Sequence, residues 1–280
     1  MSIFKYMSEN RIENILIDNK IRFTQPVYFN DPFEVKLAMK GFDTDEKLIK
    51  NFDMNFMKII QEEYEKLDFE IKYKISFETF LFFANSRKEE RKKLYLNVMG
   101  NETTFLMIKK EFDEIINKLI GILSLTTEFD NLLMWAHYSN EHKGFVVEFD
   151  SENDFFKMKD DNYIYKGIQK VNYSKIRPHK FLIENEWEEI FLTKSEEWSY
   201  ENEYRIIQRL QDADEVKGNI SLFKFPKEMI QAIYCGCNMN TLKKERIIEI
   251  IKNDNELNHI KVFEMKLSDK YYELECIQVL

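Results

Sequence analysis

A Glu-x-Glu-x-Arg pattern in the last third of the chain constrains the fold most. Glu201, Glu203 and Arg205 alternate there with other side chains, among them Tyr204 and Ile206. Side chains two residues apart lie on the same face of a strand. The pattern therefore predicts a strand that holds two carboxylates side by side and turns Tyr204 and Ile206 toward a core. Paired carboxylates favour a site that stabilises positive charge.

Length and composition predict a folded protein and exclude some nucleotide-binding classes. The 280 residues are 44% hydrophobic and 15% aromatic, which is enough to fill a sizeable core in one large domain or two modest ones. A net charge of -9 argues against a broad phosphate-binding surface. The 7 glycines form neither a P-loop nor a Rossmann pattern, so those classes are excluded.

The cysteines and the hydropathy pattern predict a soluble cytoplasmic protein without a membrane partner. Three cysteines without a paired framework are typical of a reducing compartment. The N-terminus has no apolar leader, and no run of about 18 apolar residues occurs.

Periodicity predicts an α+β fold in which strands flank a helical block. We expect one domain over residues 1–280, with an insert of about three helices at about 43–121, closed by Gly121. The acidic span 180–195 is predicted to be a helix. Strands are expected at 2–6, 21–23, 122–126, 144–149, 230–236, 259–267 and 272–279.

The strand at 122–126 has a polar face. Ser124 and Thr126 share that face, whereas Leu123 and Leu125 are predicted to point into a core. A short aromatic helix at 131–139 and an apolar strand follow, and the Glu-x-Glu strand comes later. Each element is a weak signal alone, but their order is specific.

Three motifs resemble the bacterial family called domain of unknown function 2971, a name that implies no activity. The resemblance spans about residues 3–210. Its motifs are Phe29-Asn30-Asp31-Pro32-Phe33-Glu34, then Leu133-Met134-Trp135-Ala136-His137-Tyr138 with His142-Lys143-Gly144-Phe145 and Glu148-Phe149-Asp150, and finally Trp198 with Glu201, Glu203, Tyr204 and Arg205.

The same succession more distantly resembles the core of ADP-ribosyltransferases. That resemblance implies a split β-sheet and a transferase that consumes NAD as its substrate, without a metal. It would break the bond between nicotinamide and ribose and modify an unknown acceptor, a protein or a nucleic acid. A role as an effector or toxin in bacterial defence against phage is the expected setting.

The resemblance also implies roles for individual residues. Glu203 would stabilise the oxocarbenium ion that develops on the ribose, and Glu201 would polarise the acceptor nucleophile. Ser124 would support Glu203 or the ribose, with Thr126 beside it. These are the candidate catalytic and adjoining residues.

Further residues are candidates for contacts with NAD. Tyr138 or Trp135 would stack on the nicotinamide, and Lys5 or Tyr6 occupies the first-strand position, where Lys5 suits a pyrophosphate. Asn30 is a candidate contact within a turn that Asp31-Pro32 would make rigid. Two departures from the transferase pattern are Leu125 in the middle of the Ser-x-Thr strand and the missing first-strand arginine.

Other interpretations of the same residues remain open. Glu201 and Glu203 could form an exposed strand end paired with Arg205 or a lysine. His137 and His142 are five residues apart rather than the four of a helical metal pair, which favours structural histidines. The alternative function is a non-catalytic module of the same fold that binds a protein or a nucleic acid.

Overall fold

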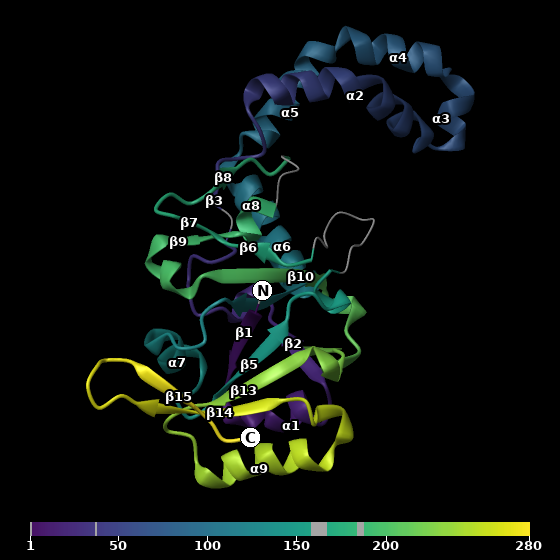
Figure 1. Cartoon of the computed structure of the whole chain (residues 1–280). Coiled ribbons are helices and arrows are strands. Elements are labelled where there is room, and N and C mark those ends of the chain that lie inside the picture. The colour runs from purple at the N-terminus through teal and green to yellow at the C-terminus, as the bar shows by residue number, and fades with distance from the viewer. Residues whose placement is uncertain (1, 37, 158–166, 184–187) are drawn as a thin grey trace. The chain divides into compact units, whose positions relative to one another are not determined.

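The computed structural model describes residues 2–36, 38–157, 167–183 and 188–280 (Figure 1). The chain divides into two compact units. The sheet unit comprises Met1–Lys36, Ile115–Arg177 and Glu188–Leu280. The helical unit comprises Leu37–Glu114 and Pro178–Trp187.

An eight-stranded mixed sheet forms the centre of the sheet unit. The strand order is β15-β14-β13-β5-β1-β4-β10-β6, with one parallel pair, β13 and β14, among antiparallel neighbours. The strands are β1 (Ser2–Met7), β4 (Ile120–Thr126), β5 (Phe145–Asp150), β6 (Gln169–Lys170), β10 (Glu203–Arg209), β13 (Ile230–Cys235), β14 (Lys261–Leu267) and β15 (Leu274–Gln278).

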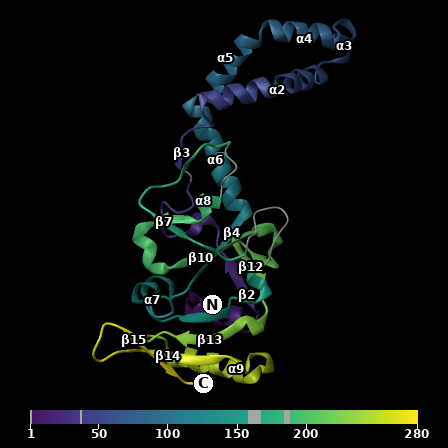
Figure 2. The ribbon, with the colours of Figure 1, turned by 45° about the horizontal axis from the view of Figure 1, so that its top comes forward.

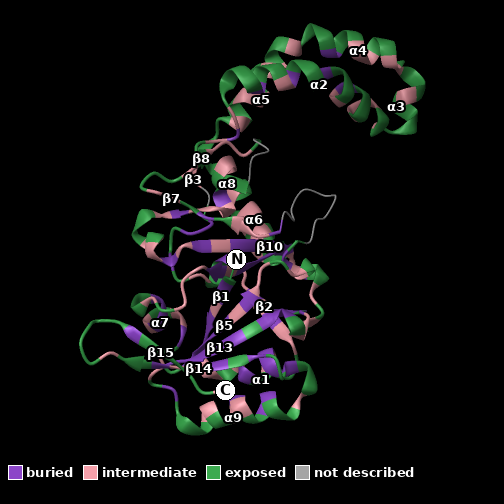
Figure 3. Ribbon diagram, in the orientation of Figure 1, coloured by how far each residue is buried: buried purple, intermediate pink, exposed green. Residues whose placement is uncertain are grey.

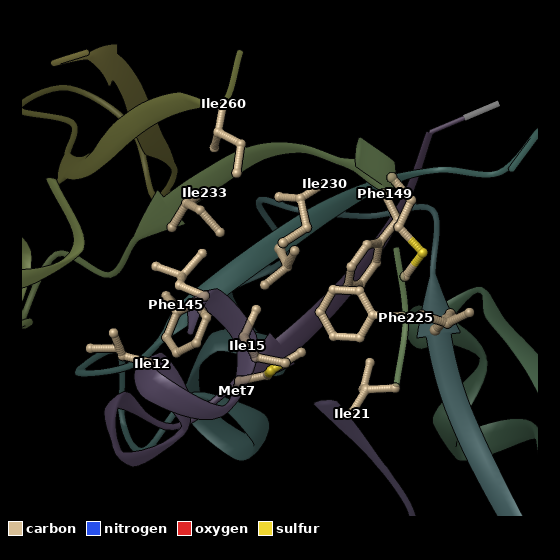
Figure 4. Packing of buried hydrophobic residues seen from close by; sticks show 14 of the residues in the cluster. Met7, Ile12, Ile15, Ile21, Phe145, Phe149, Phe225, Ile230, Ile233 and Ile260 are labelled. Carbon is tan, nitrogen blue, oxygen red and sulfur yellow. The ribbon is translucent and has the colours of Figure 1, made fainter. Parts of the chain in front are cut away.

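Alternation along the strands places one core on one face of this sheet. Phe145, Val147 and Phe149 of β5 are fully buried there with apolar residues of α1 (Ile12–Leu16) and α9 (Thr241–Asn253). Figure 4 shows part of this cluster, where side chains of α1 meet those of β5 and β13. Burial of these side chains is the main stabilising term of the unit.

A second, smaller core lies on the opposite face. Tyr6 of β1 and Val146 of β5 pack there with Met134 and Trp135 of α7 (Leu132–Tyr138). Asn131 caps α7 through its side-chain oxygen, which accepts from the backbone amides of Leu133 and Met134. In Figure 3, β10 and the central strands β1 and β5 are largely purple, since most of their residues are buried, whereas the edge strand β15 is mostly exposed.

Pairing of β4 with β10 aligns the predicted site residues. Thr126 is opposite Glu203 and Ser124 is opposite Arg205, so all four share one face. The predicted alternation of β4 is confirmed, since Leu123 and Leu125 are buried in the core on the other face. Tyr204 and Ile206 contact that same core, as the sequence predicts.

Two smaller sheets complete this unit. One has the order β11-β12-β2, built from β2 (Lys20–Phe23), β11 (Glu215–Lys217) and β12 (Ile220–Lys224). A bridge between Thr24 and Ile122 joins the end of β2 to β4. The other sheet pairs β7 (Asn172–Ser174) with β9 (Thr193–Ser195) in parallel, and α8 (Glu188–Phe191) precedes β9.

The helical unit is built around a hairpin of helices. In Figures 1 and 2, α2 runs alongside α4, and α3 joins them. Phe52, Phe56 and Ile60 of α2 form its small core with Ala84 of α4. The helices are α2 (Asp45–Glu65), α3 (Phe69–Lys74), α4 (Phe77–Ser86), α5 (Lys88–Met99) and α6 (Glu102–Leu119), which continues into the sheet unit; β3 (Ala38–Met39) pairs with β8 (His179–Lys180).

The α+β class is confirmed, but three local predictions are wrong. The residues at 43–121 form five helices instead of about three, because short polar breaks interrupt the apolar periodicity. Gly121 lies inside β4, where an added Cβ would meet Phe23 and Leu210 at 2.8 and 2.4 Å, so close packing requires the glycine there. The acidic span 180–195 contains the short α8 and the strand β9; residues 184–187 lie outside the described part of the chain.

None of the helices in the described part of the chain is both long and apolar enough to cross a bilayer.

Gly144 before β5 is expected to tolerate no side chain. A Cβ at this position would lie 2.0 Å from the Met7 carbonyl oxygen and 2.8 Å from that of Ser139. The backbone must therefore move, and Gly144→Ala is expected to lower the free energy of unfolding by about 1–3 kcal/mol. Urea denaturation measures this change. Gly100→Ala, after α5, is the control and should change stability much less, because its one close contact, 3.1 Å from the Leu96 carbonyl oxygen, requires a shift of only a few tenths of an ångström.

Candidate functional site

Most of the predicted site residues line one cavity of about 370 Å³ in the sheet unit. Its wall combines charged side chains with aromatic rings, the composition of small-molecule sites. It is lined by Phe4, Lys5, Tyr6, Arg22, Thr24, Tyr28, Phe29, Asn30, Glu34, Ser124, Leu125, Thr126, Met134, His137, Tyr138, Lys194, Glu201 and Glu203.

Glu203 is held at the cavity by two buried cations. Its Oε1 accepts from Arg205 Nε at 2.8 Å, and its Oε2 accepts from Arg205 Nη2 at 2.9 Å. Lys194 Nζ donates to the same Oε2 at 3.1 Å. The backbone amide of Glu203 donates to the Tyr173 hydroxyl at 2.8 Å. The fork of Arg205 thus fixes the orientation of the carboxylate.

Lys194 joins three carboxylates into one network. Its Nζ lies 2.6 Å from Glu201 Oε2, 3.1 Å from Glu203 and 3.6 Å from Glu34. Glu34 also forms an ion pair with Arg205. We call these five residues the ion network. Each has a side chain that is at most 4% exposed, so the charges interact through a poorly screened interior.

The two glutamates meet through a turn rather than along one strand. Glu201 ends a 3₁₀ helix, Glu196–Glu201, and Glu203 begins β10. Asn202 between them has a φ of 42°, in the left-handed region that Asn tolerates better than most residues. The prediction that both lie on one strand is therefore wrong. Their carboxylates converge because each binds Lys194.

The network sets the charge of its members. Burial opposes ionisation of Glu203, but Arg205 and Lys194 outweigh burial and lower the pKa of Glu203 to about 2. Burial raises the pKa of Glu34 despite the same two cations. Burial also disfavours the charge of Lys194, yet Glu203 and Glu34 raise its pKa above the usual lysine value. Glu203 is accordingly anionic at neutral pH.

A hydrogen-bonded chain links Glu201 to the rim of the cavity. The Tyr138 hydroxyl donates to Glu201 Oε1 at 2.6 Å and accepts from Asn30 Nδ2 at 3.2 Å. Burial and the neighbouring Glu201 raise the pKa of Tyr138, so the phenol stays protonated. Thr126 Oγ1 donates to the Glu201 carbonyl at 2.6 Å and accepts from Glu128 N at 3.0 Å, which gives it a role in holding the backbone.

Ser124 and Lys5 lie where β1 and β4 border the cavity. The Ser124 side chain lines the cavity together with Glu203 and contributes to the low pKa of that carboxyl group. Lys5 Nζ donates to the Ser124 carbonyl at 2.7 Å. Burial lowers the pKa of Lys5 to about 8, although Glu203 and Glu201 partly oppose that shift. Tyr6 lines the cavity and meets the Trp135 ring edge-on, with the centroids 5.3 Å apart.

Trp135 is in the core rather than on the cavity. It is fully buried, and its Nε1 donates to the Phe129 carbonyl at 2.8 Å. The Trp135 ring therefore cannot stack on a ligand in the cavity. Of the two rings predicted to stack on nicotinamide, only that of Tyr138 lines the cavity. His137 is exposed and lines the cavity, with Nδ1 3.1 Å from the Tyr200 hydroxyl.

Sequence reasoning missed Lys194 and Glu34. Lys194 was concealed within the span predicted as an acidic helix, whereas it lies on β9. Glu34 ends the Asn-Asp-Pro-Phe-Glu motif, which was interpreted as turn chemistry. Asn30 and Asp31 of the same turn are also polar, so no local signal distinguishes Glu34 as the buried charge. Among the described residues, no group of acids, histidines and cysteines is arranged to hold a metal ion.

Removal of Lys194 should destabilise the fold, and mild acid should restore part of the lost stability. Lys194→Met is expected to cost about 3–5 kcal/mol at pH 7, because buried carboxylates lose a cation. Their folded-state pKa values should rise above the unfolded values, so stability lost at pH 7 should be partly regained at pH 5. In the wild type, Glu203 titrates near 2, and its contribution is lost only as the pH falls from about 5 toward 2. Urea unfolding at pH 7 and pH 5 measures both effects.

The matched control is Lys175→Met. Lys175 forms a 3.4 Å pair with Glu196 at the surface, where its side chain is 81% exposed. Its loss should change neither the stability nor the pH profile, since exposed pairs contribute little. Equal effects of the two substitutions would contradict the assigned importance of the ion network.

Comparisons with known proteins bear on the family but not on the activity. No curated protein and no solved structure gave a significant match. The resemblance to ADP-ribosyltransferases therefore stays a prediction. Residues 134–206, which include most of α7 as well as Lys194, Glu201, Glu203 and Arg205, match the family model described as Protein of unknown function (DUF2971). Over these residues the match supports the family resemblance predicted from the sequence.

Proposed function

We propose that the cavity binds NAD and that the chain is an ADP-ribosyltransferase-like enzyme, which transfers ADP-ribose to a protein or nucleic acid. The observation that supports this proposal is convergence. Glu203, Glu201 and Ser124 line the cavity together with Lys5 and Tyr138, although the sequence separates them by up to about two hundred residues.

The reaction needs an anion more than an acid. When the bond between nicotinamide and ribose C1′ breaks, its electron pair leaves with nicotinamide, whose ring becomes neutral. Positive charge then develops on the ribose, as in glycoside cleavage. A nucleophile of the acceptor attacks C1′ and gives up its proton. The protein must therefore supply a fixed negative charge beside the ribose.

Glu203 meets that electrostatic requirement. With a pKa of about 2 it remains ionised at neutral pH, and Arg205 prevents rotation of its carboxylate. Ser124 lines the cavity together with this carboxylate and contributes to its low pKa. We assign Glu203 to stabilisation of the ribose cation and Ser124 to the orientation of Glu203.

Glu201 is the better placed of the two glutamates for contact with a hydroxyl group. Each of its oxygens accepts one hydrogen bond, one from Tyr138 and one from Lys194. Lone pairs on both oxygens are therefore left to accept a hydrogen bond from the nucleophile that receives ADP-ribose. Tyr138 lies between Glu201 and Asn30 and offers a ring to a flat leaving group. We assign Glu201 to the acceptor nucleophile and Tyr138 to the nicotinamide.

One observation favours a second candidate, a binding module that does not cleave its ligand. Both oxygens of Glu203 are already occupied by Arg205 and Lys194. A carboxylate neutralised in this way attracts a developing cation more weakly than a free one. In this alternative the ion network only shapes the cavity, and NAD or another nucleotide binds unchanged.

Nicotinamide release from NAD distinguishes the two candidates. Wild-type protein should release nicotinamide in the presence of a cell extract that supplies acceptors, as measured by chromatography. Ser124→Ala and Glu203→Gln are expected to lower the rate by about 100-fold or more, the usual effect of removing a preorganised electrostatic group. Ser124→Ala matters most, because it leaves every ion pair of the network in place.

The control for this assay is Glu196→Gln, a change of one surface carboxylate that precedes the site in sequence and pairs with Lys175. It should keep the wild-type rate. Binding of NAD without any nicotinamide release, with or without extract, would exclude the transferase and support the binding module. If calorimetry detects no NAD binding, NAD is neither the substrate of a transferase nor the ligand of a binding module in this protein.

A further inference from the structure

A second cavity of about 230 Å³ adjoins the first. The two cavities share five lining residues: Lys5, Tyr6, Arg22, Thr24 and Tyr138. The remaining residues of the second cavity come from β1, β2, β12 and the segment that leads into α1; they are Met7, Ser8, Arg11, Asn14, Ile15, Lys20, Ile21 and Leu222.

The second cavity is cationic. Lys5, Arg11, Lys20 and Arg22 line it, and its lining includes no carboxylate. Such a gathering is unexpected in a chain with 50 acidic and 41 basic residues. Like charges brought together in a partly buried space repel one another, and each loses hydration.

Ion pairing does not account for this gathering. Lys20 binds Glu215 at 2.6 Å. In contrast, Lys5, Arg11 and Arg22 have no ion-pair partner among the residues that the structure describes. Burial lowers the pKa of Arg22, and the charge of Arg11 lowers it further. The arginines therefore stand close enough to destabilise each other.

Arg22 has unused hydrogen-bonding capacity inside the protein. Its Nε is buried without a hydrogen-bond partner among the described residues. The guanidinium carbon lies 5.5 Å from the centroid of the Tyr28 ring, which holds the side chain without using its donors. A buried donor without a partner is costly, and a bound ligand commonly satisfies it.

The strand β2 directs Arg22 into this space. Ile21 and Phe23 are buried in the core, so Lys20 and Arg22 project from the other face of the strand. The bridge from Thr24 to Ile122 fixes the end of β2 against β4, beside Ser124. Arg22 is therefore positioned by the sheet and lines both cavities.

We propose that Arg11 and Arg22, with Lys5 at the junction of the two cavities, form a binding subsite for the phosphoryl groups of a small phosphate ester. Guanidinium groups match phosphate oxygens in geometry and charge. An anion would relieve the repulsion between the arginines and satisfy Arg22 Nε. The shared residues let the rest of the ligand extend into the larger cavity.

This inference deepens the proposed function, because NAD carries a pyrophosphate, but it does not require the cleavage reaction. The proposed subsite would also supply arginines in place of the one that the first strand lacks. Position 5 holds a lysine, and the second and third cations come from the segment before α1 and from β2. The chemistry would serve any compact nucleotide or sugar phosphate.

Calorimetry with inorganic pyrophosphate, ADP-ribose and adenosine tests the subsite at constant ionic strength. Wild-type protein should bind pyrophosphate and should bind ADP-ribose more tightly. Arg22→Gln and Arg11→Gln should each weaken pyrophosphate binding about tenfold or more, the effect of one lost charged hydrogen bond. Adenosine binding should be unchanged by either substitution. Circular dichroism confirms folding, and the half-exposed Arg11 supplies a second variant in case Arg22→Gln unfolds.

The control is Arg91→Gln, which changes the net charge equally but removes a cation already paired with Glu63 at 2.9 Å. It should bind pyrophosphate as the wild type does. The proposal is overturned if the wild type does not bind pyrophosphate, or if both variants at Arg11 and Arg22 bind it normally. If pyrophosphate binding depends on the arginines but no nicotinamide is released, only the proposed reaction is contradicted. If nicotinamide is released but pyrophosphate binding does not depend on the arginines, only the subsite is contradicted.

Discussion

The buried ion pair between Arg205 and Glu203 is the interaction on which the rest of the site depends. Arg205 is fully buried, and its guanidinium reaches Glu203, Glu34 and the Phe191 carbonyl. It thereby ties β10 to the turn that carries Glu34 and to α8. A charge in this position must remain compensated, because an unpaired ion in the interior is strongly unfavourable. The geometry of the cavity floor follows from that requirement.

Much of the fold could be predicted because its signals are local. The alternation of Leu123 and Leu125 with Ser124 and Thr126 determines which face of β4 is polar, and no distant residue is needed to recognise it. The start of α7 has a local signal too, since Asp130 and Asn131 are both capping residue types, and the structure assigns the cap to Asn131. The expectation that Ser124 lies near Glu203 came instead from the resemblance to ADP-ribosyltransferases, and the pairing of β4 with β10 puts both residues on one face.

The rest could not be predicted because it depends on contacts between distant segments. Lys194 lies in a span whose acidic composition predicts a helix. Only the pairing of β9 with β7 places this lysine beside Glu201 and Glu203. The left-handed turn at Asn202 could not be predicted either, because the Glu-x-Glu-x-Arg alternation is typical of a continuous strand. Trp135 belongs to a seven-residue helix, too short for periodicity to show which ring is buried.

The two ends of the joined cavities carry opposite charge. The ion network holds three carboxylates and two cations, so one negative charge is in excess when all are ionised. Lys5 lies between this end and the arginines of the second cavity. A ligand with a cationic ring at one end and phosphates at the other complements such a field, and reversing it would place like charges together. Arg11 and Arg22 form no ion pair among the described residues, so these two charges stay available to an anion even in an acidic protein.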